Sequence, residues 1–392
     1  MPVSHPRNFG HLLVPSVPPV LAPLTHLSTF THLFIAFHVS DVLSECYSRA
    51  RFALSSPFAS ARLRTVLLTL LFLSCPFCCA SLAPTDGHCA NFVVLSPPVQ
   101  TIHEQTVIVV IHPALGVPGA YYSRLAKHLC ERNDWIVAVQ EQRGQGSSSW
   151  RASRTCNWSY WTPVALDFHL HLQLLRDSYP KNPIFLLGHS VGFVLWSLWL
   201  AKMTREKNEE ALANISGLLG ICSGSIYYGI HPSNTLLMRS LIITFISNAL
   251  GWFPGERMGF GGQAEARGFM HDWCRSIWQD DQQPYECPHP HIMKTFKELK
   301  IPIRLMTLDN DEFTPPISTE KMAARFNPYY TSYHTIESKG ELEYKDLPGD
   351  QAHVKWARGK AILPYIEGWI KQTLQSNNTP SETTATHKQA RL

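Results

Sequence analysis

The feature that most constrains this chain is residues 188–192, sequence GHSVG, set between apolar runs at 184–187 and 193–200. A G-x-S-x-G turn between a buried strand and a helix presents its serine at the edge of a sheet. Glycine on each side lets strand and helix approach closely. The stretch therefore predicts a strand over 184–187, an exposed Ser190 hydroxyl and a helix over 192–203.

Strand and helix patterns alternate from about residue 78 onward. An opening hairpin is expected from residues 79–83 and 90–95, around a Thr-Asp-Gly turn. Further strands are predicted at 106–111, 135–139, 215–222, 303–308 and 333–337, and helices at 118–132, 163–177, 316–326 and 356–374. This alternation predicts an α/β fold with a parallel sheet covered by helices on both faces.

Three segments fall outside the alternation. Residues 225–300 form a long aromatic insertion, which predicts a helical lid or cap. Residues 1–77 contain arginines but no lysine and few acids. Three interpretations of this segment stay open: a targeting segment, a poorly ordered extension, or a wrong gene prediction. The apolar run 65–77 is shorter than a spanning helix needs, so membrane association through residues 62–80 is a further open interpretation. Residues 375–392 are polar and predicted to be disordered.

Charge and cysteine content exclude several classes of function. A net charge of +4 without a basic cluster argues against nucleic-acid binding. Cys75-x-x-Cys78 has no second pair, so neither a metal nor a redox site is expected, and Cys130 and Cys222 are predicted to be buried in the core. Oligomeric state and compartment stay open, the latter between cytoplasm, mitochondrion and membrane.

Nucleophilic catalysis by Ser190 requires a base and a carboxylate that orients it. In folds with this turn, the order along the chain is serine, acid, histidine. The loop after the strand at 303–308 supplies Asp311 as first choice, then Asp309 and then Glu312. His353 is expected in the loop before the last helix, whereas His334 lies in a predicted strand and His387 in the tail.

The oxyanion formed in such a reaction needs two backbone N–H donors. Val191 follows the serine and is expected to supply one. Ala114, in the loop after the strand at 106–111, is expected to supply the other, with Leu115 as the alternative.

Five motifs in this order resemble the α/β-hydrolase superfamily, in particular the group near serine aminopeptidases and monoacylglycerol lipases. They are residues 112–118 (HPALGVP), 143–147 (RGQGS), 188–192, 253–255 (FPG) and the Asp311 loop. The resemblance covers residues 78–374 and implies an eight-stranded, mostly parallel sheet with a helical lid over about 225–300, no cofactor, and Ser190, Asp311 and His353 as the triad. Two departures, residues 140–142 (QEQ) and Ala352, do not touch the triad atoms.

These expectations lead to a serine hydrolase of esterase or lipase type that cleaves a carboxylic ester, either lipid-like or of a small acyl group, with an apolar small-molecule acyl substrate. An aminopeptidase or amidase of the same fold is the enzymatic alternative. A non-catalytic binding protein is the alternative outside enzymes, because a fold does not fix a function.

Overall fold

A computed structural model of the chain describes residues 77–82, 86–88, 90–231, 233–260, 262–337 and 349–378. The N-terminal extension, except its last residue, and residues 379–392 lie outside these ranges, as do residues 62–76 of the candidate membrane segment. Residues 77–80 of that segment belong to the first strand of the sheet. No described helix is long and apolar enough to cross a membrane.

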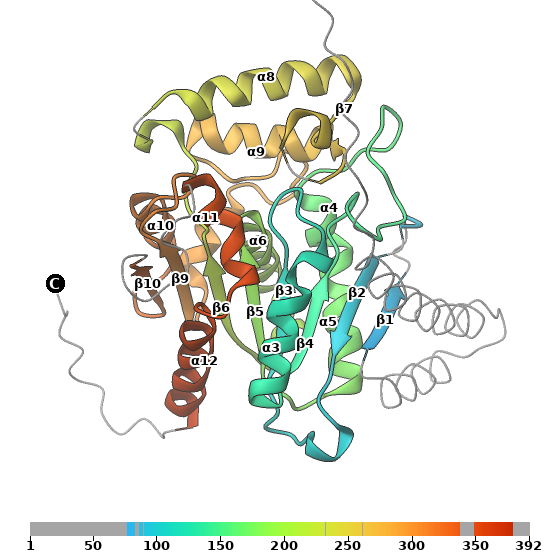
Figure 1. The fold of residues 1–392 in the computed structure, drawn as a ribbon, viewed down its shortest axis with the longest axis vertical. Coiled ribbons are helices and arrows are strands. Elements are labelled where there is room, and N and C mark those ends of the chain that lie inside the picture. Colours follow the sequence, from blue (N-terminus) through green and yellow to red (C-terminus); the bar gives the residue numbers. More distant parts are fainter. Residues whose placement is uncertain are drawn as a thin grey trace, which may run out of the picture. The chain divides into compact units, whose positions relative to one another are not determined.

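Eight strands form one sheet in the order β1-β2-β4-β3-β5-β6-β9-β10 (Figure 1). The pairs β1–β2 and β2–β4 are antiparallel and all other neighbours are parallel, which confirms the predicted fold class. The strands are β1 (Phe77–Leu82), β2 (Ala90–Leu95), β3 (Ile108–His112), β4 (Ile136–Gln140), β5 (Ile184–His189), β6 (Ile215–Ile221), β9 (Ile303–Leu308) and β10 (Thr331–Ile336).

The central strands carry apolar side chains on both faces because helices cover both. Ile108 and Val110 of β3 belong to one core cluster, and Val109 and Ile111 belong to the other. This split follows from the two-residue period of a strand. The first core also holds α4 (Trp161–Ala165), α5 (Asp167–Ser178), α6 (Val191–Arg205) and part of α10 (Pro316–Ala323), and the second holds α3 (Ser123–Asn133) and α12 (Leu363–Asn378).

Helix boundaries differ from the predictions at several places. The helix predicted at 118–132 is a 3-10 helix, η2 (Gly119–Tyr122), followed by α3, and the helix predicted at 316–326 ends at Ala323. The helix predicted at 163–177 is two helices, α4 and α5, joined at Leu166. The helix predicted at 356–374 is a short 3-10 helix, η6 (Trp356–Arg358), followed by α12, because Gly359 ends the first and Pro364 suits the first turn of the second. The tail was predicted to start at 375, but α12 continues to Asn378, since polar residues are tolerated on its exposed face.

The insertion between β6 and β9 is mainly helical. It contains α8 (Thr235–Leu250), a two-stranded sheet of β7 (Trp252–Phe253) and β8 (Glu265–Ala266), α9 (Arg267–Gln279) and two 3-10 helices, η3 (Tyr228–Ile230) and η5 (Ile292–Glu298). Figure 1 shows α8 and α9 side by side beyond the carboxyl ends of the parallel strands. In folds of this kind ligands bind at that edge of the sheet.

Arg143, in the glycine-rich turn after β4, holds three segments together. Its buried guanidinium binds Asp167 of α5 with two bonds of 2.6 Å and Asp86 of the opening turn with one of 2.7 Å. A paired arrangement of this kind compensates the cost of burying the charge. We therefore assign the RGQG motif a structural role, in which it fixes the loops around the carboxyl edge.

Candidate active site

Ser190 lies at the turn from β5 to α6 in a strained backbone conformation. Its φ is 53° and its ψ is −118°, a region that costs energy for any residue with a side chain. A Cβ at Gly188 would lie 2.2 Å from the Phe193 nitrogen, and one at Gly192 would lie 2.5 Å from the His112 carbonyl oxygen. Both glycines are therefore required by close backbone contacts, and the turn directs Ser190 out of the carboxyl edge of the sheet.

The structure brings the hydroxyl of Ser190 together with His353 and Asp311. The distance from Ser190 Oγ to His353 Nε2 is 3.1 Å, and that from His353 Nδ1 to Asp311 Oδ2 is 2.8 Å. The serine is half-buried, whereas the imidazole and the carboxylate are buried. This is the geometry in which a histidine can accept a proton from a serine while a carboxylate fixes its tautomer.

The carboxylate of Asp311 is held by several further donors. The Phe313 and Thr314 N–H groups each donate to Oδ1 at 2.9 Å, and Thr314 Oγ1 donates to Oδ2 at 2.7 Å. Burial opposes ionisation of Asp311, but the charge and hydrogen bond of His353 and the donors of Thr314 outweigh it and lower its pKa to about 2. Asp311 is therefore a fixed anion beside the imidazole at neutral pH.

The alternative residues lie elsewhere. Asp309 and Glu312 are exposed, whereas the carboxylate bonded to His353 Nδ1 is that of Asp311. His334 lies in β10, exposed, with its ring near Tyr365. The loop predicted for His353 is in fact a short helix, α11 (Gly349–Lys355), although it lies between the last strand and the last helix as expected.

The backbone donors around Ser190 require one correction. The N–H of Ala114, the first choice for the oxyanion site, donates to Tyr122 Oη at 3.0 Å and is not free to bind a substrate oxygen. Among the described residues, the N–H groups of Leu115 and Val191 have no hydrogen-bond partner. Leu115, the alternative, therefore stays the candidate for the second donor, together with Val191.

Tyr122 and His189 connect the Ala114 loop to the triad histidine. Tyr122 Oη lies 2.6 Å from His189 Nδ1, and His189 Nε2 lies 2.7 Å from the His353 carbonyl oxygen. Trp356 Nε1 is also directed at His189 Nε2, but at 3.3 Å, so we assign the Nε2 proton to the shorter bond with the carbonyl. Burial, and then the charge of His353, hold the pKa of His189 well below its usual value, so this imidazole is neutral.

No sequence pattern indicated this connection. Tyr122 fits an apolar helix position and His189 is a variable position of the G-x-S-x-G motif, so neither was a candidate. Thr314 was also missed, because its role depends on the local fold of the Asp311 loop.

Cys222 lies behind the triad as a buried neutral thiol, as predicted for a core residue. Its Sγ atom, a carboxylate oxygen of Asp311 and a ring nitrogen of His353 all lie within 4.8 Å of one another. Burial, followed by the charge of Asp311, raises the pKa of the thiol well above its usual value. Because the carboxylate and the imidazole already bind each other and the thiol keeps its proton, these atoms fit a triad better than a metal site.

The insertion closes over Ser190. Trp273 of α9 stacks on Phe313 at 6.2 Å between ring centroids, and Phe313 in turn contacts the His353 ring at 4.9 Å. The cavity beside Ser190 measures about 20 Å³, room for about one water molecule. A molecule larger than water therefore does not fit this cavity as it stands in the structure.

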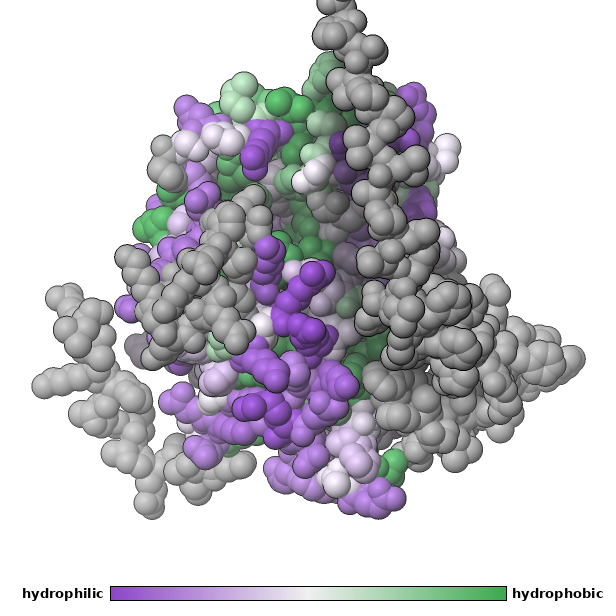
Figure 2. All heavy atoms as spheres, viewed as in Figure 1, coloured by the Kyte–Doolittle hydropathy of each residue, from purple (hydrophilic) through white to green (hydrophobic). Residues whose placement is uncertain are grey.

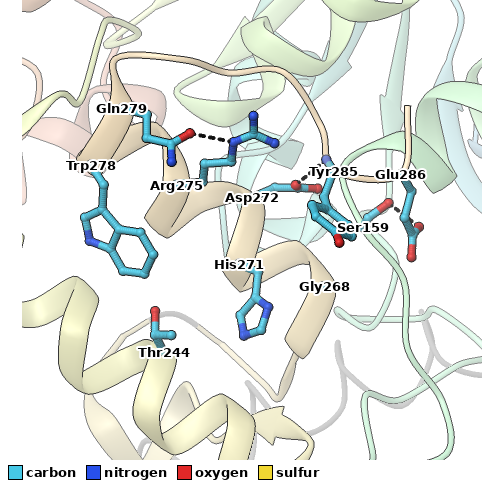
Figure 3. A pocket seen from close by; sticks show the side chains of 10 residues that line it. All are labelled: Ser159, Thr244, Gly268, His271, Asp272, Arg275, Trp278, Gln279, Tyr285 and Glu286. Atoms are coloured by element: carbon cyan, nitrogen blue, oxygen red, sulfur yellow. Dashed lines mark hydrogen bonds between the residues drawn. The ribbon is translucent and has the colours of Figure 1, made fainter. Parts of the chain in front are cut away.

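A larger cavity of about 520 Å³ lies on another face of α9 (Figure 3). Asp272 lines it, and its carboxylate accepts hydrogen bonds from the backbone N–H groups of Tyr160 and Tyr285 at 3.0 and 2.8 Å. Burial raises the pKa of Asp272 to about 6. Ser190 does not line this cavity, so it is not the site of the chemistry described above.

Comparison with known protein families gives a match over part of the chain. Residues 103–246 match the family model described as serine aminopeptidase S33, a range that includes Ser190 but neither Asp311 nor His353. No curated protein sequence matches the chain.

Solved structures similar to the chain include the α/β-hydrolase GrgF from Penicillium sp. sh18 (12% identity, TM-score 0.48, 77% of this chain and 99% of that one). A second is a putative lipase (lip1) from Acinetobacter baumannii AYE, with 14% identity and a TM-score of 0.47 over 77% of this chain and 93% of that one. A third is a monoacylglycerol lipase from Paleococcus ferrophilus, with 14% identity and a TM-score of 0.42 over 68% of this chain and 98% of that one. The match to the serine aminopeptidase S33 family thus covers residues 103–246, less than half of the chain, and shows a similarity over that segment.

Proposed function

We propose that this protein is a serine hydrolase that cleaves carboxylic esters through an acyl-enzyme. The observation that carries the proposal is the continuous set of hydrogen bonds from Ser190 through His353 to Asp311. His353 Nε2 accepts the Ser190 proton as Oγ attacks the substrate carbonyl carbon, and then returns it to the leaving alcohol. A water molecule, activated by the same nitrogen, releases the acid and regenerates the serine.

The N–H groups of Val191 and Leu115 stabilise the oxyanion in both steps. A preorganised donor of this kind contributes about 3–4 kcal/mol to the transition state. Asp311 keeps the proton of His353 on Nδ1, so that Nε2 faces Ser190 as an acceptor.

The lining of the cavity beside Ser190 supports an apolar acyl group. It is formed by Val194, Ile226, Trp273 and Tyr160, with polar groups from Ser276, Gln282 and Thr314. No carboxylate lines this cavity among the described residues, so it offers no charged partner to a substrate ammonium group. This favours esters over the free amino termini that an aminopeptidase binds. The family description favours the aminopeptidase, which stays the alternative.

A substrate series tests the proposal. Hydrolysis of p-nitrophenyl esters of increasing chain length should exceed that of aminoacyl p-nitroanilides, and Ser190→Ala should abolish it. Ser197→Ala is the matched control, because it removes a buried hydroxyl that bonds the Phe193 carbonyl in the same helix. Faster cleavage of the anilides would support the aminopeptidase, and turnover retained in Ser190→Ala would refute both.

A further inference from the structure

Glu265, in strand β8 of the insertion, carries a fully buried carboxyl group that the chemistry proposed for Ser190 does not use. Apolar residues are frequent in this insertion even at its surface, where Figure 2 shows hydrophobic side chains gathered over α8 at the top of the view. Burial raises the pKa of Glu265 well above its usual value, although hydrogen bonds from the Gly116 N–H and Gln145 act against this. The structure therefore favours the neutral, protonated acid, and a buried group of this kind needs hydrogen-bond partners.

Two glutamines of the glycine-rich turn after β4 face this carboxyl group. Gln145 donates from Nε2 to Glu265 Oε1 at 2.8 Å, and its amide oxygen accepts the N–H of Gln263 at 3.0 Å. Gln142 Nε2 lies 3.5 Å from Glu265 Oε2, while Gln142 Oε1 is buried without a partner among the described residues. A half-turn of the Gln142 amide gives the proton of Glu265 an acceptor. The segment 263–265 is therefore joined to this turn by side-chain amides and not by an ion pair.

The loop after β3 is held by the same part of the insertion. Residues 114–117 form a turn in which the Val117 N–H donates to the Ala114 carbonyl at 3.1 Å, with Gly116 at a φ of 70°. A positive φ at the third residue is that of a type II turn. The Gly262 N–H donates to the Gly116 carbonyl at 2.6 Å, and a Cβ at Gly262 would lie 2.8 Å from that oxygen. The insertion is therefore in direct backbone contact with this turn.

Leu115, the candidate for the second oxyanion donor, is the second residue of this turn. On one side of it, the Gly116 N–H bonds Glu265, so that both backbone polar groups of Gly116 face the insertion. On the other side, the Ala114 N–H bonds Tyr122. The peptide groups that flank the Leu115 N–H are thus both held by buried side chains. A donor fixed in this way is preorganised for the charge that develops on a substrate oxygen.

We propose that Glu265 is a positioning residue for ester hydrolysis, whose neutral carboxyl group holds the 114–117 turn so that the Leu115 N–H points at the substrate oxyanion. The residue acts through Leu115 and does not line the cavity beside Ser190. This role rests on the proposed function, because it deepens the account of the oxyanion site. Loss of the carboxyl group weakens an interaction made in the transition state, so kcat should fall while KM stays nearly unchanged.

Steady-state kinetics of the full chain on a soluble p-nitrophenyl ester test this role. Glu265→Leu removes both oxygens from a side chain of similar size and should lower kcat about 10- to 100-fold. Glu265→Gln keeps an uncharged group with an acceptor for Gln145 and should retain the kcat of the wild type. Ser240→Ala is the matched control, because this fully buried hydroxyl bonds Leu237 and Trp278 inside the insertion. Its loss should leave kcat unchanged.

A double-mutant cycle separates positioning from a general loss of structure. Leu115→Pro removes the N–H through which Glu265 is proposed to act, and proline suits the second position of a type II turn. Leu115→Pro should therefore be as slow alone as in combination with Glu265→Leu. Hydrogen exchange gives a readout that needs no substrate. The backbone amides of residues 116 and 117 should exchange about tenfold faster in Glu265→Leu than in the wild type or in Glu265→Gln.

Three results would overturn the role of Glu265. The first is a wild-type kcat, or wild-type exchange at residues 116 and 117, in Glu265→Leu. The second is a double mutant in which the losses from Leu115→Pro and Glu265→Leu multiply, and the third is a Glu265→Gln protein as slow as Glu265→Leu. A wild type that cleaves neither esters nor anilides would instead refute the proposed function and the catalytic part of this role, while exchange would still report whether Glu265 holds the turn.

Discussion

Replacing Tyr122 with phenylalanine tests the connection between the oxyanion loop and the triad histidine. The phenol oxygen accepts the Ala114 N–H at 3.0 Å and bonds His189 Nδ1 at 2.6 Å, and the side chain is fully buried. Without the hydroxyl, a buried N–H and a buried imidazole nitrogen both lose their partner. Each such group costs about 1–3 kcal/mol, so Tyr122→Phe should lose about 2–6 kcal/mol of stability.

Activity should fall for a separate reason. His189 holds the carbonyl of His353, and the Ala114 N–H fixes the loop that carries Leu115, so both loosen together. A misplacement of about 1 Å at a catalytic group can cost about 100-fold in rate. We therefore expect Tyr122→Phe to lower kcat by about 10- to 100-fold at 25 °C with KM nearly unchanged.

Urea unfolding and steady-state kinetics on a soluble ester measure both effects. Tyr333→Phe is the control, since its side chain is 49% exposed in β10 and should change neither quantity. Wild-type kcat and stability in Tyr122→Phe would refute the role assigned to this hydrogen-bond chain.

Two further predictions concern the candidate site, and a third concerns Asp272 in the larger cavity. Asp311→Asn should lower kcat about 10⁴-fold, because the amide stabilises the wrong His353 tautomer; a loss below tenfold in ester kinetics would contradict this. Leu115→Pro removes an N–H and should lower kcat about 10²–10³-fold, whereas Leu115→Ala retains it and should be nearly neutral; equal rates would exclude Leu115 as donor. Because burial raises the pKa of Asp272 from 3.8 to about 6, the native state holds this proton more tightly than the unfolded state. The stabilisation by the protonated Asp272 is thus present below pH 4 and is lost as pH rises through 6, by about 3 kcal/mol. Asp272→Asn does not titrate, so between pH 4 and pH 7 its free energy of unfolding in urea should rise by about that amount relative to the wild type. A difference between the two proteins that stays constant with pH would refute the shift.

The positions of the strands along the chain and the place of the serine turn were predictable because both depend on local patterns. Residues 184–192 run from an apolar strand into a glycine-flanked turn, and this pattern can be recognised without any distant part of the chain. The outer hairpin and the helical insertion were likewise identified from apolar runs and turn residues.

The oxyanion loop was not predictable at single-residue level. Whether Ala114 or Leu115 has a free N–H depends on the hydroxyl of Tyr122, eight residues further on, and on how a short 3-10 helix, η2 (Gly119–Tyr122), orients that ring. The split of the last helix at Gly359 also depends on packing that periodicity alone does not reveal. Local sequence patterns thus indicate helices and strands, whereas tertiary contacts decide whether a particular backbone N–H has a hydrogen-bond partner.

The insertion shows the same limit. Its aromatic content predicted a lid, but the sequence did not reveal which face of α8 is buried, because both faces of this helix are apolar. Trp273 over Phe313 and His353 could be recognised only once α9 was placed beside the Asp311 loop.

Labelling with a fluorophosphonate, followed by mass spectrometry of the peptide that carries Ser190, tests the central claim most directly. The reagent reacts with a serine that a neighbouring base activates, as expected for an Oγ placed 3.1 Å from His353 Nε2. A single adduct on Ser190 is predicted in the folded wild type, with none in heat-unfolded protein and at least a 100-fold slower reaction in Asp311→Asn. Folded wild-type protein that takes up no label on Ser190 would contradict the account.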